Sequence, residues 1–165
     1  MLDPVHIESL DLDARGVTRL IDSSGRPGKV IFVEGALPGE WVTYKSYRIK
    51  SKFEQAHLLK IFKSSVMRIE PQCSAFDRCG GCSMQHIDPR AQLAMKQRVL
   101  EDNLKYLAKT RPEVLLRPIA GPAWGYRYRA RLSVRLLSKN DVLVGFHEKK
   151  KSYVADISSC DILPK

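Results

Sequence analysis

The sequence predicts a mainly β fold with some α: a small β-barrel, a cysteine-rich loop, one helix and a small antiparallel β domain. Short β-prone runs separated by Gly and Pro fill the first third of the chain. Three cysteines crowd into the stretch Cys73–Cys82, and a later stretch alternates between polar and apolar residues. A chain of 165 residues can form two small domains, which we expect at residues 1–62 and 63–165.

The first domain has β-prone runs at residues 30–33, 41–44 and 56–62. Turn residues such as Leu37-Pro-Gly-Glu40 separate these runs. Short strands at such close spacing favour a small barrel of the OB or SH3 type. Gly16 would suit a bulge or a sharp barrel corner.

A helix is predicted to begin directly after the cysteine loop. Asp88 is a good N-cap, Pro89 suits the first helical position, and Arg111-Pro112 is expected to end the helix. An apolar stripe at helical spacing predicts packing against a core. The stripe consists of Leu93, Leu100, Leu104 and Leu107.

A second β region is expected at about residues 117–160. Alternation from Tyr126 to Leu136 predicts a strand with one buried face, followed by a turn at 138–141 and a hairpin partner at 142–146. Guanidinium groups bind phosphate bidentately, so a row of them indicates contact with a nucleic-acid backbone, although a solvated outer face is the alternative. The exposed face of the predicted strand carries Arg127, Arg129, Arg131 and Arg135.

The net charge of +10 is unevenly placed. Residues 63–165 carry nineteen Lys and Arg against ten Asp and Glu, whereas residues 1–62 carry nine against eight. This asymmetry favours an anionic partner, most commonly nucleic acid. No apolar run approaches the roughly 20 residues that span a bilayer, and the N-terminus lacks the pattern of a signal peptide. We therefore expect a cytoplasmic protein with no membrane partner and no obligate protein partner.

The four cysteines, Cys73, Cys79, Cys82 and Cys160, follow the pattern C-x5-C-x2-C with one distant member. A reducing compartment disfavours a disulfide. Cys79 and Cys82 could form a thiol-redox pair, but the βαβ surroundings of such pairs are missing and Cys73 would have no role. A structural zinc site usually pairs two C-x2–4-C knuckles. Three close thiolates and one distant one favour a [4Fe–4S] cluster over zinc, and both metals stay open.

These features together resemble the N-terminal part of the RumA-type 23S rRNA uracil-C5 methyltransferases. The resemblance implies an OB-like TRAM β-barrel that binds RNA at residues 1–62 and an iron–sulfur-containing central domain at 63–165. It also implies that the four cysteines hold a [4Fe–4S] cluster serving RNA binding, and that Arg131 lies near the RNA and the target uridine. The matching segments are Ile7–Asp11, Arg15–Val17, Val30–Glu40, Cys73–Cys82 followed by Gln85-His86, Tyr126–Ser133, and Cys160–Leu163.

Members of this family bind S-adenosylmethionine in a further domain that also supplies the catalytic cysteine. This chain has no such domain and no spare cysteine, so we expect neither catalytic nor S-adenosylmethionine-binding residues in it. The resemblance implies the RNA-recognition half of a longer enzyme that methylates C5 of a uridine in 23S rRNA, inactive by itself. Because a related tRNA enzyme lacks both the barrel and the cluster, an rRNA substrate is favoured. The alternative is a stand-alone nucleic-acid-binding TRAM or zinc protein without catalytic activity.

Overall fold

The computed structural model describes residues 3–21, 24–137 and 141–165. Contacts within the chain divide it into two compact units, Met1–Arg68 with Ala94–Arg111, and Ile69–Leu93 with Pro112–Lys165. The expected mainly β fold is confirmed, whereas the expected domain boundary at residues 62 and 63 stays a prediction. No helix in the described part of the chain is long and apolar enough to cross a membrane.

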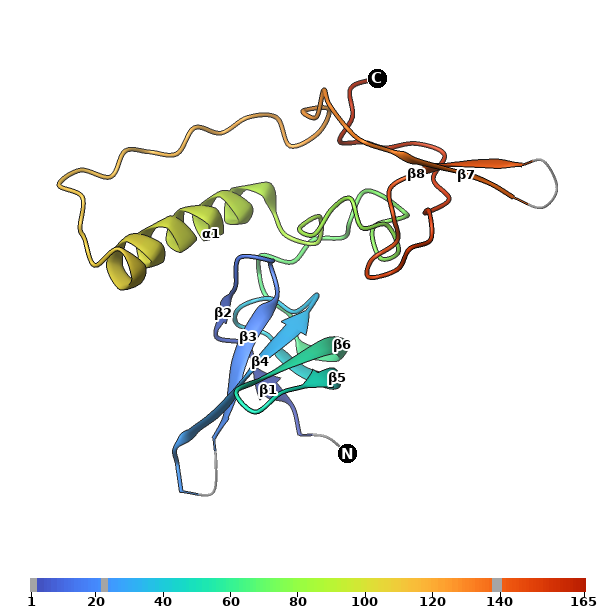
Figure 1. Ribbon diagram of the computed structural model, residues 1–165. Coiled ribbons are helices and arrows are strands. Elements are labelled where there is room, and N and C mark those ends of the chain that lie inside the picture. Colours follow the sequence, from blue (N-terminus) through green and yellow to red (C-terminus); the bar gives the residue numbers. More distant parts are fainter. Residues whose placement is uncertain (1–2, 22–23, 138–140) are drawn as a thin grey trace. The chain divides into compact units, whose positions relative to one another are not determined.

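A six-stranded sheet dominates the first unit, with the strand order β1-β5-β6-β4-β3-β2 (Figure 1). Neighbouring strands are antiparallel except for β4 and β6, which are parallel. The three runs that the sequence marks as β-prone lie in β4, β5 and β6. The strands are β1 (Val5–His6), β2 (Ser9–Leu10), β3 (Gly16–Ile21), β4 (Pro27–Glu34), β5 (Trp41–Ile49) and β6 (Phe53–Lys63).

One face of this sheet forms the hydrophobic core of the first unit. Alternate residues of β4, β5 and β6 point inward, as the two-residue period of a strand requires. Gly16 lies against this core, because a Cβ there would come within 2.9 Å of both Ala36 O and a methyl group of Ile7. The register shift in β3 lies between Arg19 and Ile21, so Gly16 provides close packing instead of the expected bulge. The fully buried core residues are Ile7, Ile31, Val33, Ala36, Val42 and Ala56.

The Leu37-Pro-Gly-Glu40 segment forms a tight turn around a buried carboxylate. The Glu40 N–H donates to Leu37 O at 3.2 Å, and Gly39 has φ +82°, as position i+2 of a type II turn requires. The Glu40 side chain is fully buried and accepts hydrogen bonds from Leu37 N at 2.9 Å and Ser65 N at 3.2 Å. Arg68 donates to both of its oxygens, at 2.7 and 2.9 Å. The turn is thereby tied to the segment that follows β6.

The helix begins where the sequence predicts. Helix α1 spans Pro89–Asp102 and continues as a π-helical turn, η1 (Asn103–Leu107). Asp88 caps the start by accepting the Arg90 N–H at 2.8 Å. Lys109 has φ +51°, and Thr110 N donates to Leu104 O at 2.9 Å, so a left-handed cap stops the helix before the expected Arg111-Pro112.

The apolar stripe of this helix does not form a core. Leu100 is 51% exposed, Leu107 is 78% exposed, and α1 has no buried side chain. The expectation that the stripe packs against a core is therefore wrong for the described residues. Helical periodicity shows which residues share a face, but burial requires a second element to cover that face.

The second β region is a short antiparallel hairpin of β7 (Ser133–Leu136) and β8 (Val142–Gly145). The predicted turn between them falls mainly on residues 138–140, which lie outside the described residues. The predicted strand from Tyr126 begins only at Ser133, because that is where pairing with β8 begins. Its supposedly buried face is also exposed, since Tyr128 is 83% and Val134 and Leu136 are each 68% exposed. A two-stranded ribbon has no second layer to bury such a face.

Candidate functional site

The cysteine loop is built from consecutive tight turns. Phe76 N donates to Cys73 O at 3.0 Å, and Cys79 N donates to Ala75 O at 2.7 Å. Gly80 N then donates to His147 O at 2.8 Å, so the loop joins the segment that follows β8. The local backbone therefore brings Cys73, Cys79 and Cys82 close together before any ligand is considered.

All four cysteines are free and line one pocket within the second unit. The loop supplies three of them, and Cys160 comes from the segment after β8, where Leu163 N donates to Cys160 O at 3.1 Å. The spacing of the cysteines in the sequence suggested that Cys160 joins the other three, and in the structure it lines the same pocket. The other pocket-lining side chains include Phe76, Gln85, Phe146, Ile157 and Ile162.

The pocket makes the Cys82 thiol less acidic than usual. Burial raises the pKa of Cys82, the neighbouring thiols raise it further, and a hydrogen bond with Gln85 only partly opposes this. An activated redox thiol needs a lowered pKa, so the direction at Cys82 is opposite to that of a thioredoxin-like pair. Gln85 also accepts the Cys73 N–H at 3.1 Å, a role that the sequence indicated only through the motif that follows Cys82.

The two glycines between Cys79 and Cys82 are required by close packing. A Cβ on Gly80 would lie 2.8 Å from His147 O, and a Cβ on Gly81 would lie 3.0 Å from the Phe146 ring. The Gly81 N–H also reaches a sulfur, since Gly81 N lies 3.4 Å from Cys79 Sγ. The loop thus presents one backbone donor to a cysteine sulfur, and such donors stabilise metal-bound thiolates.

The arrangement of the four thiols distinguishes between the two candidate metal centres. Among the described residues, no three His, Cys, Asp or Glu side chains lie close enough to hold one metal ion. A tetrahedral zinc ion with Zn–S bonds of about 2.3 Å would require thiolates about 3.8 Å apart. A cubane cluster binds one thiolate at each of its separated irons, so four thiols around one pocket fit a cluster better than a single ion.

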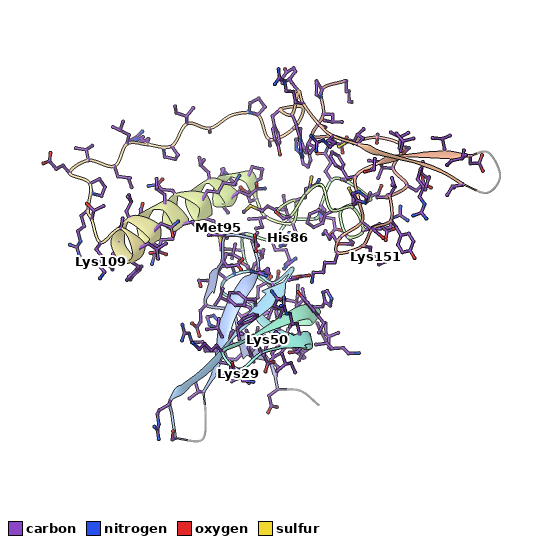
Figure 2. All side chains as sticks on the ribbon, in the orientation of Figure 1. Lys29, Lys50, His86, Met95, Lys109 and Lys151 are labelled. Carbon is purple, nitrogen blue, oxygen red and sulfur yellow. The ribbon has the colours of Figure 1, made fainter. Side chains whose placement is uncertain are left out.

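His86 does not line this pocket. It is 4% exposed, and its ring lies 5.5 Å from the Phe76 ring (labelled in Figure 2). On the other side of the loop, Lys149 Nζ lies 4.0 Å from the centroid of Phe76, a contact that the sequence did not suggest.

The four predicted RNA-binding arginines are distributed over two kinds of structure. Arg135 lies in β7, whereas Arg127, Arg129 and Arg131 lie in the irregular segment before it. Arg127 is partly held, because its N–H donates to Ile162 O at 2.9 Å and its guanidinium lies 5.3 Å from the Phe146 ring. Arg129 and Arg131 are exposed. A single regular strand face carrying all four is therefore not present, and their contact with RNA stays a prediction.

Comparisons with known proteins were made by sequence and by structure. No protein-family model matches the chain. The 23S rRNA (uracil(1939)-C(5))-methyltransferase RlmD of Cupriavidus pinatubonensis is 68% identical over 98% of the chain, and that of Burkholderia pseudomallei is 65% identical over 96%. The chain covers 35% and 34% of these proteins, so it spans about a third of the length of the curated relatives it matches.

A solved structure matches to a similar extent. The tRNA (uracil-54, C5)-methyltransferase of Pyrococcus abyssi, in complex with S-adenosyl-L-homocysteine, matches 98% of the chain with a TM-score of 0.60 and 26% identity, and the chain covers 33% of it. Because this tRNA enzyme matches the chain throughout the barrel as well, the barrel by itself does not distinguish an rRNA substrate from a tRNA substrate. Sequence and fold together identify the chain as a relative of the uracil-C5 RNA methyltransferases over the third of their length that it covers, with the 23S rRNA enzymes as its high-identity relatives.

Proposed function

We propose that this chain is the RNA-recognition part of an S-adenosylmethionine-dependent methyltransferase that methylates C5 of a uridine in 23S rRNA. The observation that carries the proposal is 68% identity over 98% of the chain to an enzyme of that name. Methyl transfer and S-adenosylmethionine binding belong to residues outside this chain. The exposed leucines of α1 support the proposal, because a longer protein would offer further elements to cover them.

The second part of the proposal concerns the cysteines. Cys73, Cys79, Cys82 and Cys160 would hold a [4Fe–4S] cluster, supported by their convergence on one pocket and by the two closely packed glycines. Such a cluster supplies a covalent cross-link between the loop and the C-terminal segment. These residues would then act structurally, holding the irregular segment that begins at Gly125, whose N–H donates to Asp161 O at 2.9 Å, in position for RNA.

Metal analysis of anaerobically purified protein tests the cluster. We expect a brown protein with close to four irons and four sulfides per chain, and loss of both in Cys160→Ser. The matched control is Ser159→Ala, which changes the neighbouring pocket residue and should keep the iron. A colourless protein with one zinc would support the alternative of a nucleic-acid-binding zinc protein, and iron retained in Cys160→Ser would refute the four-ligand site.

RNA binding is tested at Arg131. We expect Arg131→Ala to weaken binding of a fluorescein-labelled 23S rRNA stem-loop and to reduce the slope of log K against log salt by about one. Arg98→Ala is the matched control, because Arg98 is an exposed arginine on α1 already paired with Asp102 at 3.0 Å. An unchanged salt slope for Arg131→Ala would indicate that the arginines are solvated surface residues with no role in binding.

A further inference from the structure

Within residues 1–63, positive charge is concentrated on one pair of strands and the turn that joins them. Residues 41–63, which contain β5 and β6, carry six Lys and Arg against a single acidic residue, Glu54. Residues 1–40 carry four Lys and Arg against seven Asp and Glu, so the nearly balanced charge of residues 1–62 as a whole conceals this contrast. Figure 2 labels one of the six, Lys50, at the turn between the strands. The six cations are Lys45, Arg48, Lys50, Lys52, Lys60 and Lys63.

The same strands expose aromatic side chains on their outer face. Val42 and Ala56 point into the core, so their chain neighbours Thr43 and His57 point to the opposite, outer face. Directly opposite outward pairs are Trp41 with Lys63, Thr43 with Lys60, and Lys45 with His57. The exposed aromatic residues along this face are Trp41 at 44%, Tyr47 at 42% and Phe62 at 54%.

Ring contacts organise these side chains in advance. The Trp41 ring lies 5.4 Å from the His6 ring, and Lys60 Nζ lies 4.9 Å from the centroid of Phe62. These contacts restrain the side chains before any ligand arrives, and such preorganisation lowers the entropic cost of binding.

Glu34 orients a second pair of rings on this face. Its carboxylate accepts the Tyr47 hydroxyl at 2.7 Å and lies 3.3 Å from His57 Nδ1. The Tyr47 and His57 rings lie 4.5 Å apart. Contacts with Glu34 therefore hold two adjacent aromatic rings at the protein surface, although aromatic rings are more often buried in a core.

We propose that this outer face binds a single-stranded segment of RNA by base stacking. The stacking face consists of Trp41, Tyr47, His57 and Phe62 together with Lys45, Lys60 and Lys63. Exposed aromatic rings stack with unpaired bases of any sequence, and interleaved lysines neutralise the phosphates between them. The inference rests on the proposed RNA-binding function and adds a contact surface separate from the arginines.

Fluorescence of Trp41 tests the stacking directly. The chain has two tryptophans, so the change Trp124→Phe leaves Trp41 as the only reporter. Titration with a 12-nucleotide oligouridine should quench Trp41, because a stacked base deactivates the indole. A 12-base-pair RNA duplex should quench far less, since its bases are already stacked within the helix. Unchanged Trp41 fluorescence at saturating oligouridine would overturn the proposal.

Affinity measurements separate stacking from charge. Phe62→Ala should weaken oligouridine binding by about 5- to 150-fold, the effect of losing one base–aromatic stack, without changing the salt slope. Phe62→Tyr, which keeps the ring, should restore the affinity. Lys60→Gln should instead reduce the salt slope by about 0.7, as expected for one phosphate contact on a single strand.

The matched control for Phe62 is Tyr106→Ala. Tyr106 is another exposed aromatic residue, 61% exposed, with Lys105 Nζ 4.8 Å from its ring centroid, but it lies on η1. Its removal should leave the affinity unchanged, and circular dichroism should show that each variant is folded. Equal effects of Phe62→Ala and Tyr106→Ala would refute a specific stacking face.

Arg131→Ala, measured in parallel, distinguishes the two proposals. If Arg131→Ala weakens binding and Phe62→Ala does not, the stacking face is wrong while the proposed function stands. If the intact protein binds neither oligouridine nor the rRNA stem-loop, the proposed function itself fails. Weaker binding in both variants supports two separate contact surfaces.

Discussion

Replacing Glu40 with Ala should strongly destabilise the first unit. The Glu40 carboxylate is fully buried and accepts four hydrogen bonds, two of them from the Arg68 guanidinium, whose side chain is only 21% exposed. Glu40→Ala therefore leaves a half-buried cation without its partner and strips the N–H groups of Leu37 and Ser65 of their acceptors. Breaking one side of a buried ion pair costs about 3–5 kcal/mol. The residual exposure of Arg68 places our expectation near the lower value.

Urea unfolding provides the measurement. In the Trp124→Phe background, Trp41 at the start of β5 reports on the unit that contains Glu40. With an m value of about 2 kcal/mol/M, a loss of about 3 kcal/mol would lower the urea midpoint by about 1.5 M. Asp102→Asn is the control, because it breaks the exposed pair with Arg98 and should change the free energy of unfolding by less than about 0.5 kcal/mol.

A double-mutant cycle separates this ion pair from simple loss of packing. Arg68→Met alone leaves the carboxylate of Glu40 buried without its cation. The double variant Glu40→Gln/Arg68→Met removes both charges and should cost less than the sum of the single changes. A loss below about 1 kcal/mol for Glu40→Ala, or strict additivity in the cycle, would refute the assignment of Glu40 and Arg68 as a buried stabilising pair.

Three further predictions follow from the packing and charge of the described residues. Burial opposes ionisation of Glu40, but hydrogen bonds from Arg68, Leu37 and Ser65 outweigh it and hold its pKa below the ordinary value. The stabilisation by ionised Glu40 is thus complete above about pH 4.3 and is lost as the pH falls toward the lower pKa of the folded state. Urea titrations across that pH range should show that the free energy of unfolding depends less on pH in Glu40→Gln than in the unchanged protein. Identical pH profiles for the two proteins would contradict the pKa shift. Gly145→Ala should destabilise the second unit by about 1–3 kcal/mol in thermal unfolding because its Cβ would meet the Ala155 carbonyl oxygen, whereas Gly121→Ala, with open space around it, should be neutral. Leu100→Gln should change the free energy of unfolding by less than about 0.5 kcal/mol because Leu100 is 51% exposed, while Ile31→Val in the core should cost about 0.5–1.5 kcal/mol; a larger effect at Leu100 would mean that the helix face is covered.

Much of the first unit could be predicted from local patterns. Runs of β-branched and aromatic residues marked β4, β5 and β6, and Asp88-Pro89 marked the start of α1 within one residue. These signals act over a few residues, through backbone sterics and capping hydrogen bonds, so they can be read from the sequence without knowledge of the fold. The Leu37-Pro-Gly-Glu40 turn was visible in the same way, but the burial of Glu40 was not, because it depends on Arg68 returning from the far end of β6.

The predictions that were wrong share one physical cause. The leucines of α1 and η1 and the apolar residues of Tyr126–Leu136 have the periodicity of buried faces, yet none of these side chains is buried in the described structure. Periodicity reports only which side chains share a face. Whether that face is buried depends on a second layer that covers it, and the tertiary arrangement decides whether such a layer is present.

The sequence by itself determined the identity of the four thiols and the two glycines between Cys79 and Cys82. Only the tertiary structure decided that Cys160 joins the loop at one pocket and that the outer face of β5 and β6 brings exposed aromatic rings together with Lys45, Lys60 and Lys63. Local geometry follows from neighbouring residues, whereas convergence of distant segments depends on the path of the whole chain. The proposed functions of both sites depend on that convergence, since neither metal binding nor base stacking is a property of one residue alone.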